Sequence, residues 1–181
     1  MGTEAEIIES KVICRQPGRY IGWPTIAKAD DGELFVVFSG DRDEHVDPFG
    51  KTCFMRSSDN GATWSDAVVI TDTPLDDRDA GICVAPDGSL VVSWFTSHYD
   101  GYLDMKHYCE GEEQRWEDKI ATVSEEDVTR WTHADSGVTA GRSMGFWTRR
   151  SPDRGETWED PVPSICCTPH GPIVLLSLIH I

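Results

Sequence analysis

The sequence lacks a long apolar run and is poor in basic residues. No stretch of about 20 consecutive apolar residues occurs, the length that a membrane-spanning helix requires. The 181 residues include 16 Lys and Arg but 32 Asp and Glu, so the formal net charge is −16. Binding to a nucleic-acid backbone requires a basic face. We therefore expect no membrane partner and no nucleic-acid partner.

Cysteine pairs and a leader-like start are also missing. The six Cys residues form no C-x-x-C pair, and the first six residues are acidic with no apolar core behind them. Cys14, Cys53 and Cys83 lie in or beside strand-like runs, where a thiol behaves as a small apolar group. We expect reduced thiols and a cytoplasmic protein.

Spacings that hold metals or nucleotides do not occur. The histidines form no H-E-x-x-H pattern, and the Asp-rich stretch 76–79 has no EF-hand spacing around it. Residues 50–52 read Gly-Lys-Thr like the end of a P-loop, but His45 stands where its first glycine is needed. We expect no metal and no cofactor.

What the sequence does contain is one eight-residue pattern, S-x-D-x-G-x-T-W, at 57–64 and again at 151–158. In the first copy, Asp59 can accept hydrogen bonds from backbone N–H groups of its own turn, and Gly61 can take a positive φ. The Ser57 and Thr63 hydroxyls can tie the strand ends, and the Trp64 ring is expected to cover the turn. Each copy predicts a β-hairpin turn.

This motif resembles the Asp box of the sialidase-like β-propellers. In that family the box lies on the blade periphery and is structural, so neither copy is expected to carry chemistry. The positions that match are Ser57, Asp59, Gly61, Thr63, Trp64, Ser151, Asp153, Gly155, Thr157 and Trp158.

Two Asp-Gly turns, at 31–32 and 87–88, each lead into an apolar run rich in β-branched and aromatic residues. A four-stranded unit can be written twice on this rhythm. The expected strands are 21–29, 33–39, 52–57 and 66–71, then 80–85, 89–96, 143–150 and 160–166. The predicted fold class is all-β.

The resemblance refines this to a six-bladed propeller of which about two blades and the start of a third are present. Residues 1–175 form the partial propeller, with blade one at about 19–72, blade two at about 78–167 and the third blade from about 168. A helical insertion is expected at about 98–141, with a helix near 124–134 because Ser124 begins a capping-box-like sequence. We interpret 176–181 as a non-native tail.

The family resemblance also implies where a site would lie. Sialidase-like propellers bind the substrate carboxylate with three arginines, the first of which stands before Ile-Pro. Here Gly22 takes that position, which puts binding by the usual triad in doubt, and Arg19 is the nearest substitute. The loop 39–49 resembles the one that bears the family's acid/base Asp, and it presents Arg42 and Asp47 as candidate catalytic residues.

Each candidate has an alternative interpretation. Asp47 can cap a surface loop instead of exchanging protons, and His45 is a rival base or a substrate-binding residue. Arg78 can bind a substrate carboxylate or hydroxyls, or it can join adjacent blades through ion pairs. Further candidates in the second blade are His98, Tyr99, Asp100 and Arg142.

Two functions follow from the resemblance. The first is a sialidase-like glycoside hydrolase that acts on terminal sugars of glycoconjugates, with its nucleophile outside these residues. The second is a non-catalytic propeller that binds carbohydrate or protein.

Overall fold

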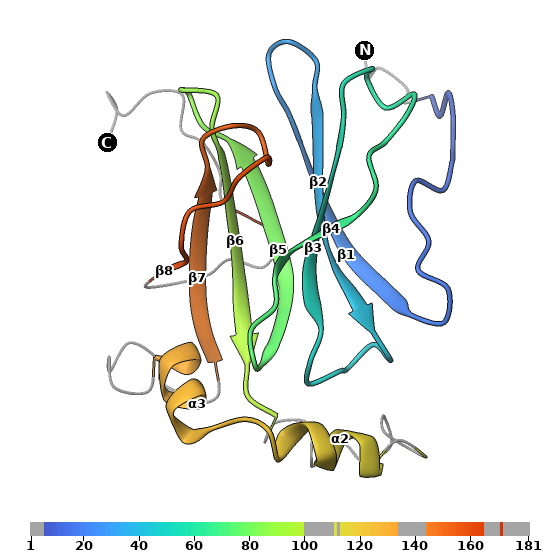
Figure 1. Cartoon of the computed structure of the whole chain (residues 1–181). Coiled ribbons are helices and arrows are strands. Elements are labelled where there is room, and N and C mark those ends of the chain that lie inside the picture. Colours follow the sequence, from blue (N-terminus) through green and yellow to red (C-terminus); the bar gives the residue numbers. More distant parts are fainter. Residues whose placement is uncertain (1–5, 100–110, 112, 134–143, 165–170, 172–181) are drawn as a thin grey trace, which may run out of the picture.

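The computed structural model describes residues 6–99, 111, 113–133, 144–164 and 171. Its strands form two four-stranded antiparallel sheets, each in the order of the chain (Figure 1). The first sheet contains β1 (Tyr20–Lys28), β2 (Leu34–Arg42), β3 (Lys51–Ser57) and β4 (Val68–Thr71). The second contains β5 (Asp76–Val84), β6 (Leu90–Ser97), β7 (Met144–Ser151) and β8 (Val162–Pro163). The predicted all-β class is confirmed.

The strands lie where the sequence places them, with differences at their ends. β5 begins at Asp76, four residues before the expected start at 80, so the acidic stretch 76–79 is part of a strand and not a loop. β2 extends to Arg42 rather than ending at 39. β8 has two described residues. The expected third blade and the tail lie outside the described residues, Gly171 excepted.

The two S-x-D-x-G-x-T-W turns connect the third and fourth strands of their sheets and have matching hydrogen bonds. In the first, the Thr63 N–H and hydroxyl donate to Asp59 at 2.8 and 2.6 Å, and the Gly61 N–H donates to the Ser57 hydroxyl at 2.8 Å. The Ser57 and Thr63 hydroxyls thus brace the turn itself rather than the strand ends. Trp64 lies against the turn, its indole N–H donating to the Gly61 carbonyl at 3.2 Å.

The second turn repeats this scheme. Thr157 donates to Asp153 from its N–H at 2.8 Å and from its hydroxyl at 2.6 Å, and the Gly155 N–H donates to the Ser151 hydroxyl at 2.7 Å. The Thr157 donors stabilise an ionised carboxylate and so lower the pKa of Asp153. The matching Thr63 donors lower the pKa of Asp59 to about 2. Here the tryptophan, Trp158, packs edge-on against Phe54 of the first sheet.

The main core fills the space between the two sheets. Alternate residues of β2 face it, because successive side chains of a strand point to opposite faces. Its buried members come from both sheets: Ala29, Phe35, Val37, Phe54, Ile70, Ala80, Ile82, Leu90, Val92, Trp94 and Trp147. β5 lies against β1 and β2, and the Thr25 hydroxyl donates to the Ala80 carbonyl at 3.1 Å. The sheets are therefore joined across their faces.

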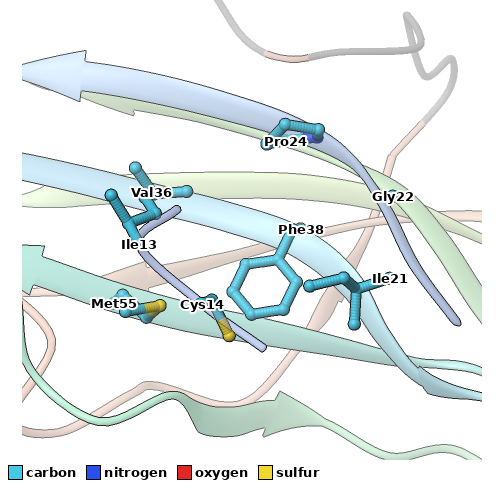
Figure 2. Close-up of a pocket in the computed structure, with 8 residues that line it drawn as sticks. All are labelled: Ile13, Cys14, Ile21, Gly22, Pro24, Val36, Phe38 and Met55. Carbon is cyan, nitrogen blue, oxygen red and sulfur yellow. The ribbon is translucent and has the colours of Figure 1, made fainter. Parts of the chain in front are cut away.

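A smaller cluster covers the other face of the first sheet. Val36, Phe38, Cys53 and Met55 are buried there beneath the N-terminal segment that contains Ile13 and Cys14. Between this segment and the sheet is an apolar pocket of about 190 Å³ (Figure 2). Cys14, Cys53 and Cys83 are free thiols.

Gly155 sits where the second turn meets the first sheet, so replacing it with alanine is expected to destabilise the fold. A Cβ there would lie 2.4 Å from Phe54 Cε1, and φ is +95°. Overpacking and a strained backbone together should lower the free energy of unfolding by about 2 kcal/mol or more in urea denaturation. Gly32 has φ +94° with open space around it, so Gly32→Ala should lose about 1 kcal/mol. Equal losses in the two variants would contradict the close packing.

Two helices lie at the end of the sheets where β2 finishes and β5 begins (Figure 1). The expected helix near 124–134 is α3 (Glu125–Thr132), and Ser124 and Asp127 form the predicted capping box. The carbonyl of Trp131 lies so close to Gly145 of β7 that a Cβ there would be 1.8 Å away. The other helix, α2 (Glu113–Ile120), was not predicted. In the described parts of the chain, no helix has the length and apolar character needed to cross a membrane.

Candidate functional site

Arg42 and Asp76 form a buried ion pair where the two sheets meet. Arg42 ends β2 and Asp76 begins β5, and both side chains are 0% exposed. The guanidinium contacts both carboxylate oxygens, at 2.6 and 3.0 Å. A Cβ on Gly50 would lie 1.8 Å from Nη1 of Arg42, so the pair requires a glycine beside it.

Asp47 lies on the loop 43–50, between β2 and β3. Its carboxylate accepts the N–H of Asp43 at 2.6 Å and that of Phe49 at 2.7 Å, and its carbonyl accepts a hydrogen bond from Arg42 at 3.1 Å. The side chain is enclosed, with Asp47 1% exposed. Burial raises the pKa of Asp47, and the two N–H donors and the Arg42 charge offset only part of that rise. The raised pKa suits an acid/base, and the enclosure of the carboxylate suits a loop brace.

Aromatic rings occupy the adjoining surface. His45 is exposed, its Nδ1 lies 3.2 Å from the hydroxyl of Tyr20, and its ring centroid is 4.8 Å from that of Trp23. Trp23 lies at a bulge in β1 and has φ +51°. The guanidinium of Arg78 lies 4.8 Å from the Trp23 ring. We name Tyr20, Trp23 and His45 the aromatic cluster.

Arg78 and Arg19 both have carboxylate partners. Arg78, in β5, lies 3.6 Å from Asp76 and 3.7 Å from Asp79, and it spans from the Trp23 ring of the first sheet to the Phe95 ring of the second. This placement supports its role in joining the sheets, and substrate binding stays a prediction. Arg19 lies 3.0 Å from Asp41 and also pairs with Asp43.

Helix α2 covers the loop that carries Asp47. Arg115 of α2 pairs with Asp43 at 2.5 Å, Lys119 lies 5.0 Å from the Phe49 ring, and Trp116 is buried against Val46. The structure therefore assigns this part of the insertion a position over the candidate loop. A signal was present in the sequence, since Gln114 and Asp118 are four residues apart and hydrogen-bonded at 2.8 Å.

Sequence reasoning also missed Asp77, which follows Asp76 in β5 and is likewise buried. Its carboxylate accepts the N–H of Thr73 at 2.7 Å and the indole N–H of Trp94 at 2.9 Å. Burial nevertheless raises the pKa of Asp77 to about 8. Of the remaining candidates, His98 is buried with its ring centroid 4.0 Å from that of Tyr99, while Asp100 and Arg142 lie outside the described residues.

The site is thus a set of buried carboxylates and paired arginines beneath an aromatic surface. A polar pocket of about 300 Å³ adjoins it, lined in part by Arg19, Lys51 and Lys119. Within the described residues, no three His, Cys, Asp or Glu side chains are grouped so that they could hold a metal ion.

The fold is similar to solved sialidase structures. A protein of unknown function from Dyadobacter fermentans DSM 18053 gives a TM-score of 0.54 at 19% identity, over 83% of this chain and 38% of that one. The NanB sialidase of Streptococcus pneumoniae, in complex with 2-[(3-chlorobenzyl)ammonio]ethanesulfonate, gives 0.54 at 13% identity, over 85% and 38%. NanB with Optactamide gives 0.55 at 12% identity, over 84% and 37%.

At these low identities, the structural likeness shows a sialidase-like fold alone. The chain spans less than two-fifths of the length of the structures named above. No family model matches the sequence, and neither does any curated protein.

Proposed function

We propose that this chain is part of a six-bladed sialidase-like propeller whose complete form is a glycoside hydrolase acting on terminal sugars of glycoconjugates. The observation that carries the proposal is that the same structural unit occurs twice. Two successive four-stranded sheets each hold an S-x-D-x-G-x-T-W turn between their third and fourth strands, with matching hydrogen bonds. We assign these turns the structural role of Asp boxes and the sheets the role of two blades. The fold likeness to NanB supports this assignment.

In this proposal Asp47 is the acid/base, and the nucleophile belongs to blades outside these residues. Its raised pKa favours the protonated form that a general acid needs in order to protonate a leaving oxygen. Because Asp47 is 1% exposed, the loop 43–50 has to shift for the carboxyl group to reach substrate. Arg42 holds the carbonyl of Asp47 and acts by positioning this loop.

The test is hydrolysis of aryl glycosides by the complete gene product and by Asp47→Asn. We expect the variant to lose about 10²–10⁴-fold in kcat/KM on phenyl glycosides, whose leaving group needs protonation. On dinitrophenyl glycosides, whose leaving group departs as the anion, the loss should be much smaller.

Asp87→Asn is the matched control. Asp87 is a turn aspartate that accepts hydrogen bonds from Ser89 and Arg150, far along the chain from the candidate loop. The Asp87→Asn variant should hydrolyse phenyl and dinitrophenyl glycosides as fast as the wild type. Equal loss on the two substrate types would identify Asp47 as a loop brace, and no loss on either would remove it from the mechanism.

The second candidate function is a non-catalytic carbohydrate-binding propeller. The observation that favours it is the enclosure of Arg42 and Asp47: the Arg42 guanidinium donates to the Asp47 carbonyl, and the Asp47 carboxylate accepts an N–H of its own loop. Glycan binding by the complete gene product without hydrolysis of any aryl glycoside would select this function over the first.

A further inference from the structure

The arginines around the candidate site are already matched by carboxylates. Arg42 is enclosed in its bidentate contact with Asp76, where no ligand reaches it. Every one of these arginines has at least one aspartate within ion-pair distance: Arg42 with Asp76, Arg19 with Asp41 and Asp43, and Arg78 with Asp76 and Asp79. An anionic sugar would therefore find that the positive charge of these three arginines is already neutralised.

The surface beside Arg78 is aromatic. Tyr20 is 37% exposed and His45 is exposed, while Trp23 lies half-buried between them and Arg78. The ring centroids of Tyr20 and Trp23 are 5.8 Å apart, and those of Tyr20 and His45 are 5.7 Å apart. Glu44, next to His45, is exposed and supplies hydrogen-bond acceptors at the edge of the cluster.

Trp23 is held in this cluster by an unusual backbone. Positive φ is uncommon for a residue with a bulky side chain, and such conformations persist where the surrounding structure enforces them. The first strand of the second sheet has the same feature, because β5 also bulges beside a residue with positive φ, Asp79. The Asp79 N–H donates to the Ser39 hydroxyl of β2 at 3.1 Å, which ties the second bulge to the first sheet.

We propose that the site binds an uncharged pyranoside, with an apolar C–H face of the sugar on the aromatic cluster and its hydroxyls on neighbouring carboxylates. Ligand sites of this kind combine aromatic walls with a few polar groups that fix orientation. This inference rests on the proposed function and names the substrate class. It assigns Trp23 and Tyr20 as specificity-determining residues.

The test measures binding of methyl pyranosides to the 181-residue chain by saturation-transfer NMR and calorimetry. The neutral probes are the methyl glycosides of glucose, galactose, mannose and N-acetylglucosamine, and the acidic probes are those of N-acetylneuraminic acid and glucuronic acid. At least one neutral probe should bind about tenfold more tightly than either acidic probe. Its affinity should also be the same at low and high salt, because no ion pair is formed.

Trp23→Ala should lower the affinity for that neutral probe about tenfold, and Trp23→Phe, which keeps a flat ring, should lower it less. Tyr20→Ala is the second variant, because its exposed ring can be removed with little effect on folding. Trp64→Phe, at the remote turn, should change nothing.

Tighter binding of an acidic probe, binding of no probe at all, or neutral binding that both Trp23→Ala and Tyr20→Ala leave unchanged would overturn the inference. Hydrolysis of aryl sialosides by the complete gene product would also overturn it while leaving the proposed function standing. Hydrolysis of no glycoside at all would count against the enzymatic function and not against the binding preference.

Discussion

Replacing Arg42 with methionine is expected to lower the free energy of unfolding by about 3 kcal/mol, because it removes the closer of the two cations at the buried Asp76 carboxylate and leaves only Arg78, 3.6 Å away. Both side chains are 0% exposed, and their contact at 2.6 and 3.0 Å joins the last residue of β2 to the first of β5. Methionine retains most of the arginine stem, so the loss reports the missing charge more than a cavity. Urea denaturation at pH 7 measures it.

A double-mutant cycle separates the pair from its surroundings. Asp76→Asn alone should also be strongly destabilising, whereas Arg42→Met combined with Asp76→Asn should lose clearly less than the sum of the two. Arg150→Met is the control, since Arg150 is 41% exposed and pairs with Asp87 and Glu159 at the surface. It should lose at most about 1 kcal/mol. Additive losses in the cycle would show that the pair does not act as a unit.

The two turns were predictable because their chemistry is local. Within eight residues each supplies its own aspartate acceptor, its serine and threonine hydroxyls, and a glycine at positive φ. The Asp-Gly turns and the apolar runs that follow them in the sequence identified β2 and β6, again because the signal is local. The capping box identified α3, since it lies entirely within Ser124–Asp127.

The candidate site was less predictable because its contacts are long-range. The strand-like pattern from residue 80 onward did not include Asp76 and Asp77, since charged residues are depleted in strands. Their buried partners lie elsewhere in the chain: Arg42 is 34 residues from Asp76, and Trp94 is 17 from Asp77. Helix α2 escaped prediction in the same way, because Trp116 owes its burial to Val46 of the loop 43–50.

Asp77→Asn is expected to change how stability depends on pH. The pKa of Asp77 is about 8 in the folded chain, compared with about 3.9 for an unperturbed aspartate. The folded state therefore holds a proton that the unfolded state releases, so this group's contribution to stability is complete below about pH 4 and is lost as the pH rises to 8. The loss should amount to a few kcal/mol, on the scale of about 1.4 kcal/mol per pKa unit.

The neighbours of Asp77 explain why the protonated form fits. The Thr73 hydroxyl lies 3.2 Å from Oδ1 and 3.3 Å from the Leu75 carbonyl, so it can donate to Leu75 while it accepts a hydrogen bond from the protonated carboxyl group of Asp77. The Trp94 indole and the Thr73 N–H still donate to the carboxyl oxygens. No cation is among these partners, and burial is therefore the larger influence on the pKa.

The measurement is the free energy of unfolding of both proteins in urea between pH 4 and pH 8. The stability of the wild type minus that of Asp77→Asn should fall steadily across this range, because asparagine has no proton to lose. Asp59→Asn is the matched control. The pKa of Asp59 is about 2, so the difference in unfolding free energy between this variant and the wild type should stay constant above about pH 5 and change only below it. A constant difference for Asp77→Asn would mean that the buried carboxylate is charged throughout, and the donors of Thr73 and Trp94 would then outweigh its burial.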